Sequence, residues 1–328
     1  MKFWLAFWLG ILSFGLLGFF SNTQIIVSNL GQKWGSSSTP TPSSQQIFYP
    51  TLERSLLADP QLHQSYLDRY GIQLSEYRNL VRAWFNEQLN KLREQERGAR
   101  IDFQLRFGEN FAYEWRWRSS FQNQQQASRI QNFFNNLEKE AQNFFTKVIL
   151  ERGFIYENAT FFVDYPRMVA EANTVLSQWV QQFTAELQRR NLNRDQALRH
   201  VLQFCQKIPY SEFPVWDGER FIVGFYPPNF LLANQLGDCD MKSVLFAVIW
   251  ERMFPRHTAL ILTSNHMFAA VKGFARERST HSSLRINGEE FLCLEPTGEA
   301  LTPPGELAKF SLDALQAGDY RIIYPLSQ

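Results

Sequence analysis

Three side chains in the C-terminal part of the chain have the types and the order that a thiol-based relay requires: Cys239, His266 and Glu295. A cysteine thiolate is a nucleophile, and an imidazole can take up and return a proton. A carboxylate can orient that imidazole and stabilise its cationic form. A cysteine, a histidine and a glutamate in this order indicate a reaction in which the sulfur attacks a carbonyl carbon.

Each of the three residues also has an ordinary structural explanation. A lone cysteine before a helix is usually a small buried hydrophobe, and a strand histidine in the core must find partners for both ring nitrogens. A glutamate at a strand end is usually part of a salt bridge. The presence of all three, each at a suitable element and in this order, favours the relay.

The cysteine is expected in the first turn of a buried helix that runs to about Arg252. Gly237 permits a tight bend before that helix, and Asp238 is a good N-cap. Apolar residues then recur at helical spacing: Met241, Val244, Leu245, Val248 and Ile249. The helix N-terminus favours the thiolate, whereas Asp238 and Asp240 oppose it, so a cationic partner such as a histidine is required.

The histidine and the glutamate are expected on strands. Thr258 to Thr263 and His266 to Val271 read as two short apolar strands, and Glu289 to Thr297 as a third. Between them, Gly273 to Asn287 is charged and serine-rich, which predicts an exposed excursion. Alternation along the third strand places Phe291, Cys293 and Glu295 on one face.

Composition narrows the functional classes. The chain has 328 residues and a formal net charge of +1, which gives no electrostatic argument for nucleic acid. Its three cysteines are too few and too scattered for a disulfide scaffold or a zinc site with paired ligands. Cys205 lies on the apolar side of an expected helix and is predicted to pack in the core.

The first residues predict attachment to a membrane. Residues 3–20 form an almost unbroken apolar run that is long enough to span a bilayer. No small-x-small cleavage site follows, so we expect an uncleaved anchor rather than a secretory signal within residues 1–22. Lys2 places the N-terminus in the cytoplasm and the bulk of the chain outside it. Residues 23–48, rich in Ser, Thr and Pro, read as a flexible linker.

Residues 49–194 read as a mainly helical region with aromatic stripes. These include the run from Tyr77 to Phe85 and the run from Phe133 to Phe145, and we interpret both as core. Ile101 to Trp117 alternates between apolar and polar residues, which predicts a hairpin around Gly108. Alternation also puts Arg116 and Arg118 on a solvated strand face instead of a nucleic-acid surface.

Residues 195–328 resemble the transglutaminase-like superfamily, within the papain-like fold. The resemblance rests on Gly237-Asp238-Cys239-Asp240, on His266-Met267-Phe268-Ala269-Ala270-Val271 and on Leu294-Glu295-Pro296-Thr297. It implies an α+β domain in which the cysteine helix packs on an antiparallel sheet. It further implies that Cys239 is the nucleophile, that His266 is the base and that the Glu295 carboxylate orients the histidine. The family more often has Asp in place of this glutamate. Tyr226, with Trp216 second, is the implied partner of the cysteine amide in stabilising the oxyanion.

The sequence therefore predicts a membrane-tethered cysteine enzyme that acts on amide or peptide bonds of a protein or peptide. Attack by Cys239 would form a thioester with the acyl part of the substrate. That acyl group would then be transferred to water, as in a protease or amidase, or to an amine, and the sequence does not distinguish the two acceptors. No metal or organic cofactor is implied, and the oligomeric state is not specified. The alternative is an inactive module that holds a protein or glycan. Fast alkylation of Cys239 near neutral pH would favour the enzyme.

Overall fold

The computed structural model describes residues 66–157, 160–274, 282–298 and 300–325. It is a mixed α and β structure whose sheets are antiparallel, as the sequence predicts. The expected anchor in residues 3–20 and the expected linker in residues 23–48 lie outside the described residues. Within the described ranges, no helix has the length and apolar character needed to cross a membrane.

The described chain divides into two compact units. The first contains residues 71–162 and 218–221, and the second contains residues 66–70, 163–217 and the described residues from 222 onward. The resemblance predicts a domain that begins at residue 195, whereas the second compact unit resumes at residue 163. The two helices after that point pack with the cysteine helix and therefore belong to the second unit.

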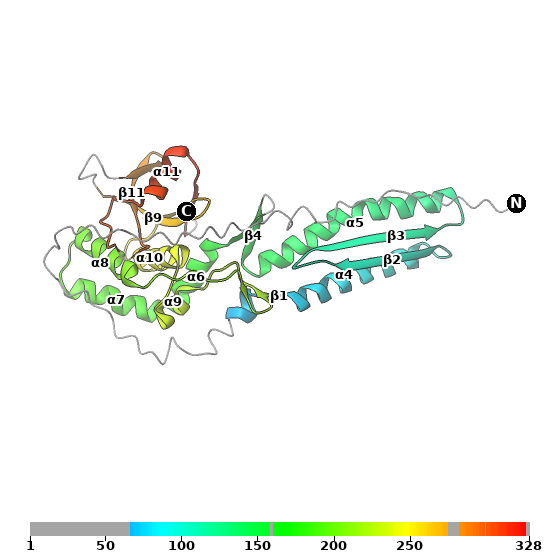
Figure 1. Ribbon diagram of the computed structural model, residues 1–328, viewed down its shortest axis with the longest axis horizontal. Coiled ribbons are helices and arrows are strands. Elements are labelled where there is room, and N and C mark those ends of the chain that lie inside the picture. Colours follow the sequence, from blue (N-terminus) through cyan, green and yellow to red (C-terminus); the bar gives the residue numbers. More distant parts are fainter. Residues whose placement is uncertain (1–65, 158–159, 275–281, 299, 326–328) are drawn as a thin grey trace. The chain divides into compact units, whose positions relative to one another are not determined.

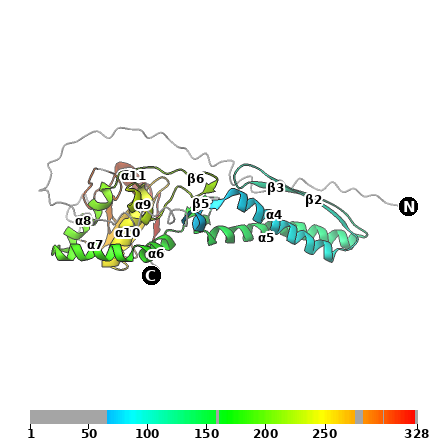
Figure 2. The same cartoon turned by 90° about the horizontal axis from the view of Figure 1, so that it is seen from below.

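The first unit consists mainly of two long helices and a hairpin that runs along them (Figures 1 and 2). The helices are α4 (Leu74–Gln95) and α5 (Gln124–Glu151), and the hairpin strands are β2 (Arg100–Phe107) and β3 (Tyr113–Ser120). The predicted hairpin is confirmed, with Phe103 opposite Trp117. The small strands of this unit are β1 (Ile72–Gln73), paired with β7 (Arg220–Phe221), and β4 (Phe154–Glu157), paired with β5 (Thr160–Val163).

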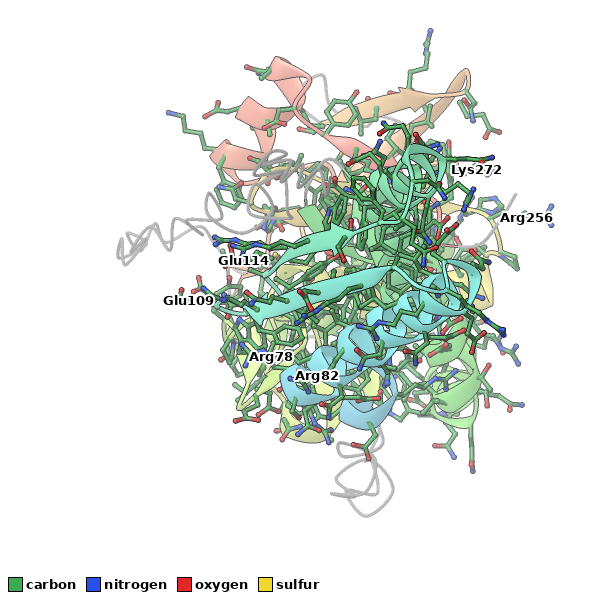
Figure 3. The ribbon with its side chains drawn as sticks, turned by 90° about the vertical axis from the view of Figure 1, so that its right-hand side faces the viewer. Arg78, Arg82, Glu109, Glu114, Arg256 and Lys272 are labelled. Carbon is green, nitrogen blue, oxygen red and sulfur yellow. The ribbon has the colours of Figure 1, made fainter. Side chains whose placement is uncertain are left out.

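Aromatic rings form the core of the first unit. Phe85 from α4 and Phe134 from α5 are buried, and the Trp117 ring stacks on Phe134 with centroids 4.1 Å apart. The aromatic stripes are therefore core, as predicted. On α4, the guanidinium groups of Arg78 and Arg82 lie 5.8 and 5.4 Å from the centroid of the Phe107 ring (Figure 3). These contacts tie the outer side of the helix to the hairpin.

The second unit is built on a five-stranded antiparallel sheet in the order β10-β11-β9-β8-β12. The strands are β8 (Thr258–Leu262), β9 (Met267–Lys272), β10 (Ser283–Ile286), β11 (Glu289–Leu294) and β12 (Arg321–Ile323). The three predicted strands correspond to β8, β9 and β11. Part of the predicted excursion is instead β10, because its backbone pairs along the edge of β11.

The cysteine helix, α10 (Cys239–Met253), lies at the centre of the second unit. Four helices surround it on one side, and the sheet lies on the other (Figure 1). These helices are α6 (Tyr165–Val175), α7 (Ser177–Arg189), α8 (Arg194–Lys207) and α9 (Pro228–Asn234). Every residue from Met241 to Glu251 is buried. The helix is thus enclosed on all faces, which explains its high content of apolar residues on every side.

The opposite face of the sheet packs against α11 (Lys309–Ala317) and its flanking residues. Alternate strand residues face the two layers, so Leu292 and Leu294 contact the α10 side, whereas Phe291 and Cys293 contact the α11 side. Cys205 and Cys293 are fully buried, and all three cysteines are free thiols. The prediction that Cys205 packs in the core is confirmed.

Candidate active site

The start of α10 is fixed by its N-cap and by close packing. The Asp238 carboxylate accepts a hydrogen bond from the backbone N–H of Met241 at 3.1 Å. Gly237 is required for a different reason from the predicted bend: a Cβ at this position would lie 2.5 Å from Cδ1 of the buried Leu231. The backbone of Gly237 also bonds to Pro209 and Ser211, which anchors the segment before the helix.

Cys239, the first residue of α10, is partly exposed, and its surroundings oppose ionisation. Burial raises the pKa of the Cys239 thiol well above its usual range, and the negative charges of Asp240 and Asp238 raise it further. A hydrogen bond from the backbone of Met267 acts in the opposite direction. The resting sulfur is consequently a protonated thiol at neutral pH, in spite of its place at a helix N-terminus.

His266 and Glu295 form a buried pair. The Nε2 atom of His266 lies 2.9 Å from Oε1 of Glu295, and the residues are 7% and 3% exposed. With the carboxylate ionised, this contact fixes the tautomer that carries its proton on Nε2. Within the described part of the chain, the second ring nitrogen, Nδ1, has no hydrogen-bond partner. This nitrogen is therefore available as a base.

The backbone of His266 is held by the turn that precedes β9. The hydroxyl of Thr263 accepts from the His266 N–H at 3.1 Å and donates to the His266 carbonyl at 3.0 Å. The Thr263 N–H donates to the same carbonyl at 2.8 Å. The ring of Phe310 meets the imidazole nearly at a right angle, with centroids 4.8 Å apart. The imidazole is thus fixed both through its backbone and through its ring.

The three predicted residues converge at one end of the sheet. His266 immediately precedes β9, Glu295 immediately follows the neighbouring β11, and these strands are antiparallel. The Cys239 thiol bonds to the backbone of Met267, the residue next to His266. Among the described contacts, the structure brings His266 and Glu295 into direct contact but no hydrogen bond joins the thiol to the imidazole.

Of the two predicted oxyanion residues, Tyr226 bonds to a different partner. The Tyr226 hydroxyl donates to Asp217 at 3.0 Å, and its ring stacks on Phe230 with centroids 4.1 Å apart in the core. Trp216 lies in β6 (Trp216–Asp217). A different tyrosine, Tyr210, is 43% exposed, and the pKa of its phenol is raised by burial and then by the charge of Cys239.

Tyr210 therefore lies near the thiol, although no sequence motif marks it as a functional residue. Its backbone forms a parallel bridge with Gly237, two residues before Cys239. The sequence feature that could have indicated Tyr210 is its position in the irregular segment directly after α8, because that segment leads back to the start of α10. That pairing joins segments that are distant in the sequence, so local pattern did not reveal it.

Asp238 and Asp240 lie beside the thiol and interact with each other. Burial and then the charge of Asp240 raise the pKa of Asp238 well above its usual range. Asp240 accepts from the Tyr165 hydroxyl at 2.8 Å and from the Met241 N–H at 2.8 Å. Across the described residues, no group of three or more His, Cys, Asp and Glu side chains is arranged to hold a metal ion.

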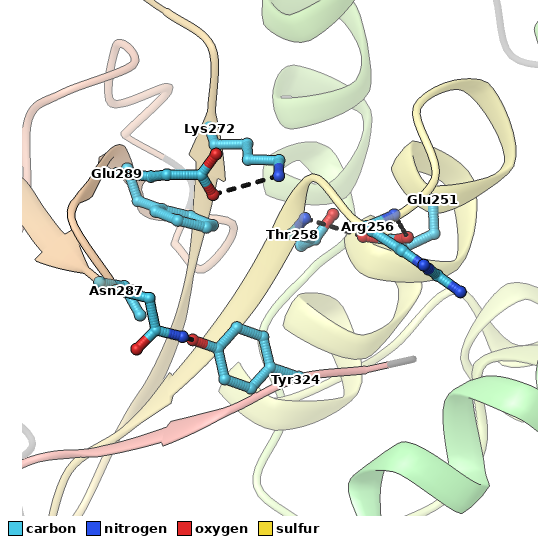
Figure 4. A pocket seen from close by; sticks show the side chains of 9 residues that line it. Glu251, Arg256, Thr258, Lys272, Asn287, Glu289 and Tyr324 are labelled. Atoms are coloured by element: carbon cyan, nitrogen blue, oxygen red, sulfur yellow. Dashed lines mark hydrogen bonds and ion pairs between the residues drawn. The ribbon is translucent and has the colours of Figure 1, made fainter. Parts of the chain in front are cut away.

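A separate pocket lies at the other end of the strands from His266 (Figure 4). It is bordered by Thr258 at the start of β8 and by Lys272 at the end of β9. Lys272 pairs with Glu289 at 3.2 Å, and the Glu251 carboxylate accepts three backbone N–H groups. Its polar groups thus stabilise local structure, and none of the three relay residues lines it.

Comparisons with known proteins add nothing to this geometry: no family model, no curated protein and no solved structure matches the chain.

Proposed function

We propose that this protein is a cysteine enzyme that acts on amide or peptide bonds through a thioester. Cys239 is the nucleophile, His266 the base and Glu295 the residue that orients the base. The observation that carries the proposal is the buried 2.9 Å contact between His266 and Glu295 at the end of the sheet where the partly exposed thiol lies. A nucleophile, a base and an orienting carboxylate are the three roles that acyl transfer needs.

The raised pKa of the Cys239 thiol determines how the reaction begins. Because the resting sulfur keeps its proton, Nδ1 of His266 takes up that proton as sulfur attacks the carbonyl carbon. Glu295 stabilises the imidazolium that results. The imidazolium then protonates the leaving amine as the carbon–nitrogen bond breaks, which leaves a thioester on Cys239. Water or a second amine attacks the thioester and returns the enzyme to its thiol form.

Two donors support stabilisation of the oxyanion. The backbone N–H of Cys239 is in the first turn of α10, where amides have no intrahelical partner. The Tyr210 hydroxyl is the second, because this phenol is near the thiol and is partly exposed. We assign this role to Tyr210 in place of Tyr226 and Trp216, since the Tyr226 hydroxyl already bonds to Asp217.

The arrangement supports a papain-like or transglutaminase-like fold for the second unit. The cysteine helix packs on an antiparallel sheet, and the base and its orienting carboxylate come from the adjacent strands β9 and β11. This agrees with the resemblance of residues 195–328, and helices α6 and α7 extend the unit before that range. The fold class is proposed on this arrangement and on the three sequence motifs.

Exposed apolar side chains around the relay support a protein or peptide substrate. Phe310 contacts the His266 ring and is 42% exposed, and Leu236, three residues before Cys239, is 38% exposed. With the partly exposed Tyr210 near Cys239, they offer apolar contact surface beside the relay residues, which is suited to the side chains of a polypeptide. We further propose that residues 3–20 anchor the chain in a lipid bilayer, with the enzyme outside the cytoplasm.

The test is the rate at which iodoacetamide alkylates each cysteine, followed by mass spectrometry of peptides between pH 6 and 9. We expect Cys239 to react far faster than Cys205 and Cys293, because Cys239 is partly exposed whereas the other two thiols are fully buried. Accessibility alone would produce that order, so a second comparison is needed. His266→Ala should slow Cys239 labelling by about tenfold or more, because the base is lost.

The matched control is His257→Ala, which removes a histidine that bonds to the Pro255 carbonyl and takes no part in the relay. It should leave the labelling rate unchanged. If Cys239 is alkylated at the same rate in His266→Ala and in His257→Ala, the His266 imidazole does not activate the thiol and the proposed chemistry is wrong. That result would favour the second candidate, an inactive module that binds a protein or glycan. The observation that favours this candidate is the thiol's hydrogen bond to Met267 instead of the imidazole.

A further inference from the structure

Helix α11 contributes two consecutive side chains to the pair formed by His266 and Glu295. The Ser311 hydroxyl donates to Oε2 of Glu295 at 3.2 Å, while Oε1 of the same carboxylate contacts His266. Phe310 packs its ring against the imidazole. The helix lies on the sheet face opposite α10, so this support comes from the layer that does not carry the cysteine.

A glutamate needs more restraint than an aspartate in this role. Its side chain has an additional rotatable bond, and its carboxylate plane turns easily about the last torsion. A hydrogen bond to the second oxygen restricts that rotation and leaves the first oxygen directed at the imidazole. Ser311 is fully buried and Glu295 is 3% exposed, so little water competes for this bond.

The backbone of Glu295 is restrained at the same time. The side-chain amide of Gln206, on α8, donates to the Glu295 carbonyl and to the Thr302 carbonyl, both at 2.8 Å. The main chain and the carboxylate of Glu295 are therefore held by different elements, α8 and α11. Among the described contacts, the bond from Ser311 is the one besides that of His266 that acts on the carboxylate itself, and it holds Oε2 so that Oε1 stays directed at the imidazole.

We propose that Ser311 is a positioning residue of this site, which fixes the Glu295 carboxylate so that it holds His266 Nε2–H and directs Nδ1 toward the thiol. It touches no substrate and acts only through Glu295. The effect on cysteine reactivity rests on the proposed function, whereas the effect on the imidazole can be measured without it. A serine at this place in α11 thus compensates for the greater length of glutamate.

The direct test follows the imidazole N–H protons by proton NMR after selective nitrogen-15 labelling of histidine. A buried Nε2–H bonded to a carboxylate gives a low-field signal that exchanges slowly with water. In Ser311→Ala, we expect this signal to move upfield and its exchange to become about tenfold faster. Ser311→Thr, which keeps the hydroxyl, should restore the signal. Gln316→Ala, an exposed change on the same helix, is the control and should have no effect.

Folding is checked separately, because the loss of a buried donor to a carboxylate lowers the stability of the folded chain. Thermal unfolding of Ser311→Ala should lie somewhat below that of Gln316→Ala, so the NMR comparison is made at a temperature at which both variants are folded. An unchanged N–H signal in Ser311→Ala would overturn the proposal. A signal that Ser311→Thr fails to restore would overturn it as well, since the hydroxyl would not be the group responsible.

The second measurement is the iodoacetamide rate at Cys239 as a function of pH. Ser311→Ala should lower the rate near neutral pH by about tenfold and Ser311→Thr should recover it. If His266→Ala itself leaves the rate unchanged, the proposed function fails, and the NMR signal still decides whether Ser311 positions the pair. If His266→Ala slows labelling and Ser311→Ala does not, the positioning role is wrong and the proposed function stands.

Discussion

At the scale of single residues, the charge around Cys239 sets its chemistry. A helix N-terminus favours a thiolate, but burial and two carboxylates outweigh it, and the pKa of the thiol rises. In the proposed reaction the thiol is therefore deprotonated during attack, with His266 as the general base. In thiol enzymes that rest as a thiolate–imidazolium ion pair, the histidine already carries the cysteine proton before the substrate binds.

Asp240→Asn should make Cys239 more reactive at neutral pH. The Asp240 carboxylate destabilises the nearby thiolate, so its removal lowers the pKa of the thiol and increases the thiolate fraction at a given pH. Asparagine keeps an oxygen that can accept from Tyr165. The measurement is the alkylation rate of Cys239 against pH, which should shift as a whole to lower pH.

The control for Asp240→Asn is Asp195→Asn, an exposed change in the first turn of α8. It should leave the profile in place. A shift to higher pH in Asp240→Asn would mean that Asp240 stabilises the thiolate, which contradicts the electrostatic explanation.

The sequence was informative about the three residues of the proposed relay and much less so about those that contact them. Cys239 was recognisable from the N-cap before it, and His266 and Glu295 from their places at strand ends. Ser311 and Gln206 gave no signal, because their contacts with Glu295 join elements that are distant in the sequence. A buried serine or glutamine in an amphipathic helix has no local pattern that distinguishes it from its neighbours.

At the scale of elements, α10 depends on a close approach at its start. Gly237 leaves space for Leu231 of α9, so the two segments pack without a side chain between them. The position of the thiol follows from this packing, because Cys239 is only two residues further along. A change at Gly237 should therefore affect both stability and reactivity.

Gly237→Ala should lower the free energy of unfolding by about 1–3 kcal/mol, because the added Cβ overlaps a buried leucine. Urea denaturation at pH 7 measures it. Adding Leu231→Ala supplies space for the Cβ, so the double variant should lose less than the sum of the two single losses. Additive losses would show that the Cβ meets no obstacle at Leu231.

Elements with a strong local pattern were predictable, and those defined by their neighbours were not. The hairpin β2–β3 follows from alternation of apolar and polar residues, and the strands β8, β9 and β11 follow from short apolar runs. Strand β10 has only four residues and lies in a charged, serine-rich segment, and it is defined by pairing with β11. Helices α6 and α7 have the same amphipathic pattern as the helices before them, so the pattern did not reveal that they pack on α10.

At the scale of the whole molecule, the proposed membrane anchor and the proposed relay lie in different parts of the chain. The described residues form two units with their own cores, and the relay belongs entirely to the second. If residues 3–20 hold the chain at a bilayer and residues 23–48 are a tether, neither is needed for the folded structure around Cys239.

Removal of residues 1–48 should move the protein from the membrane fraction to the soluble fraction. Alkylation of Cys239 should keep its rate and its pH dependence, because the relay residues remain. Deletion of residues 23–48 alone is the control and should leave the protein with the membrane. Sedimentation after cell lysis distinguishes the two, and a truncated protein that still sediments with membranes would contradict the proposed anchor.

The second unit is interrupted in sequence by the first. Tyr66 donates to the Phe225 carbonyl at 2.8 Å across a separation of 159 residues, and residues 71–162 lie between the two partners. During synthesis at about 5–20 residues per second, Tyr66 must wait several seconds before its partner leaves the ribosome. The helices and hairpin of the first unit can form in that interval. Closure of the second unit is therefore a late event, completed only after the C-terminal strands have been made.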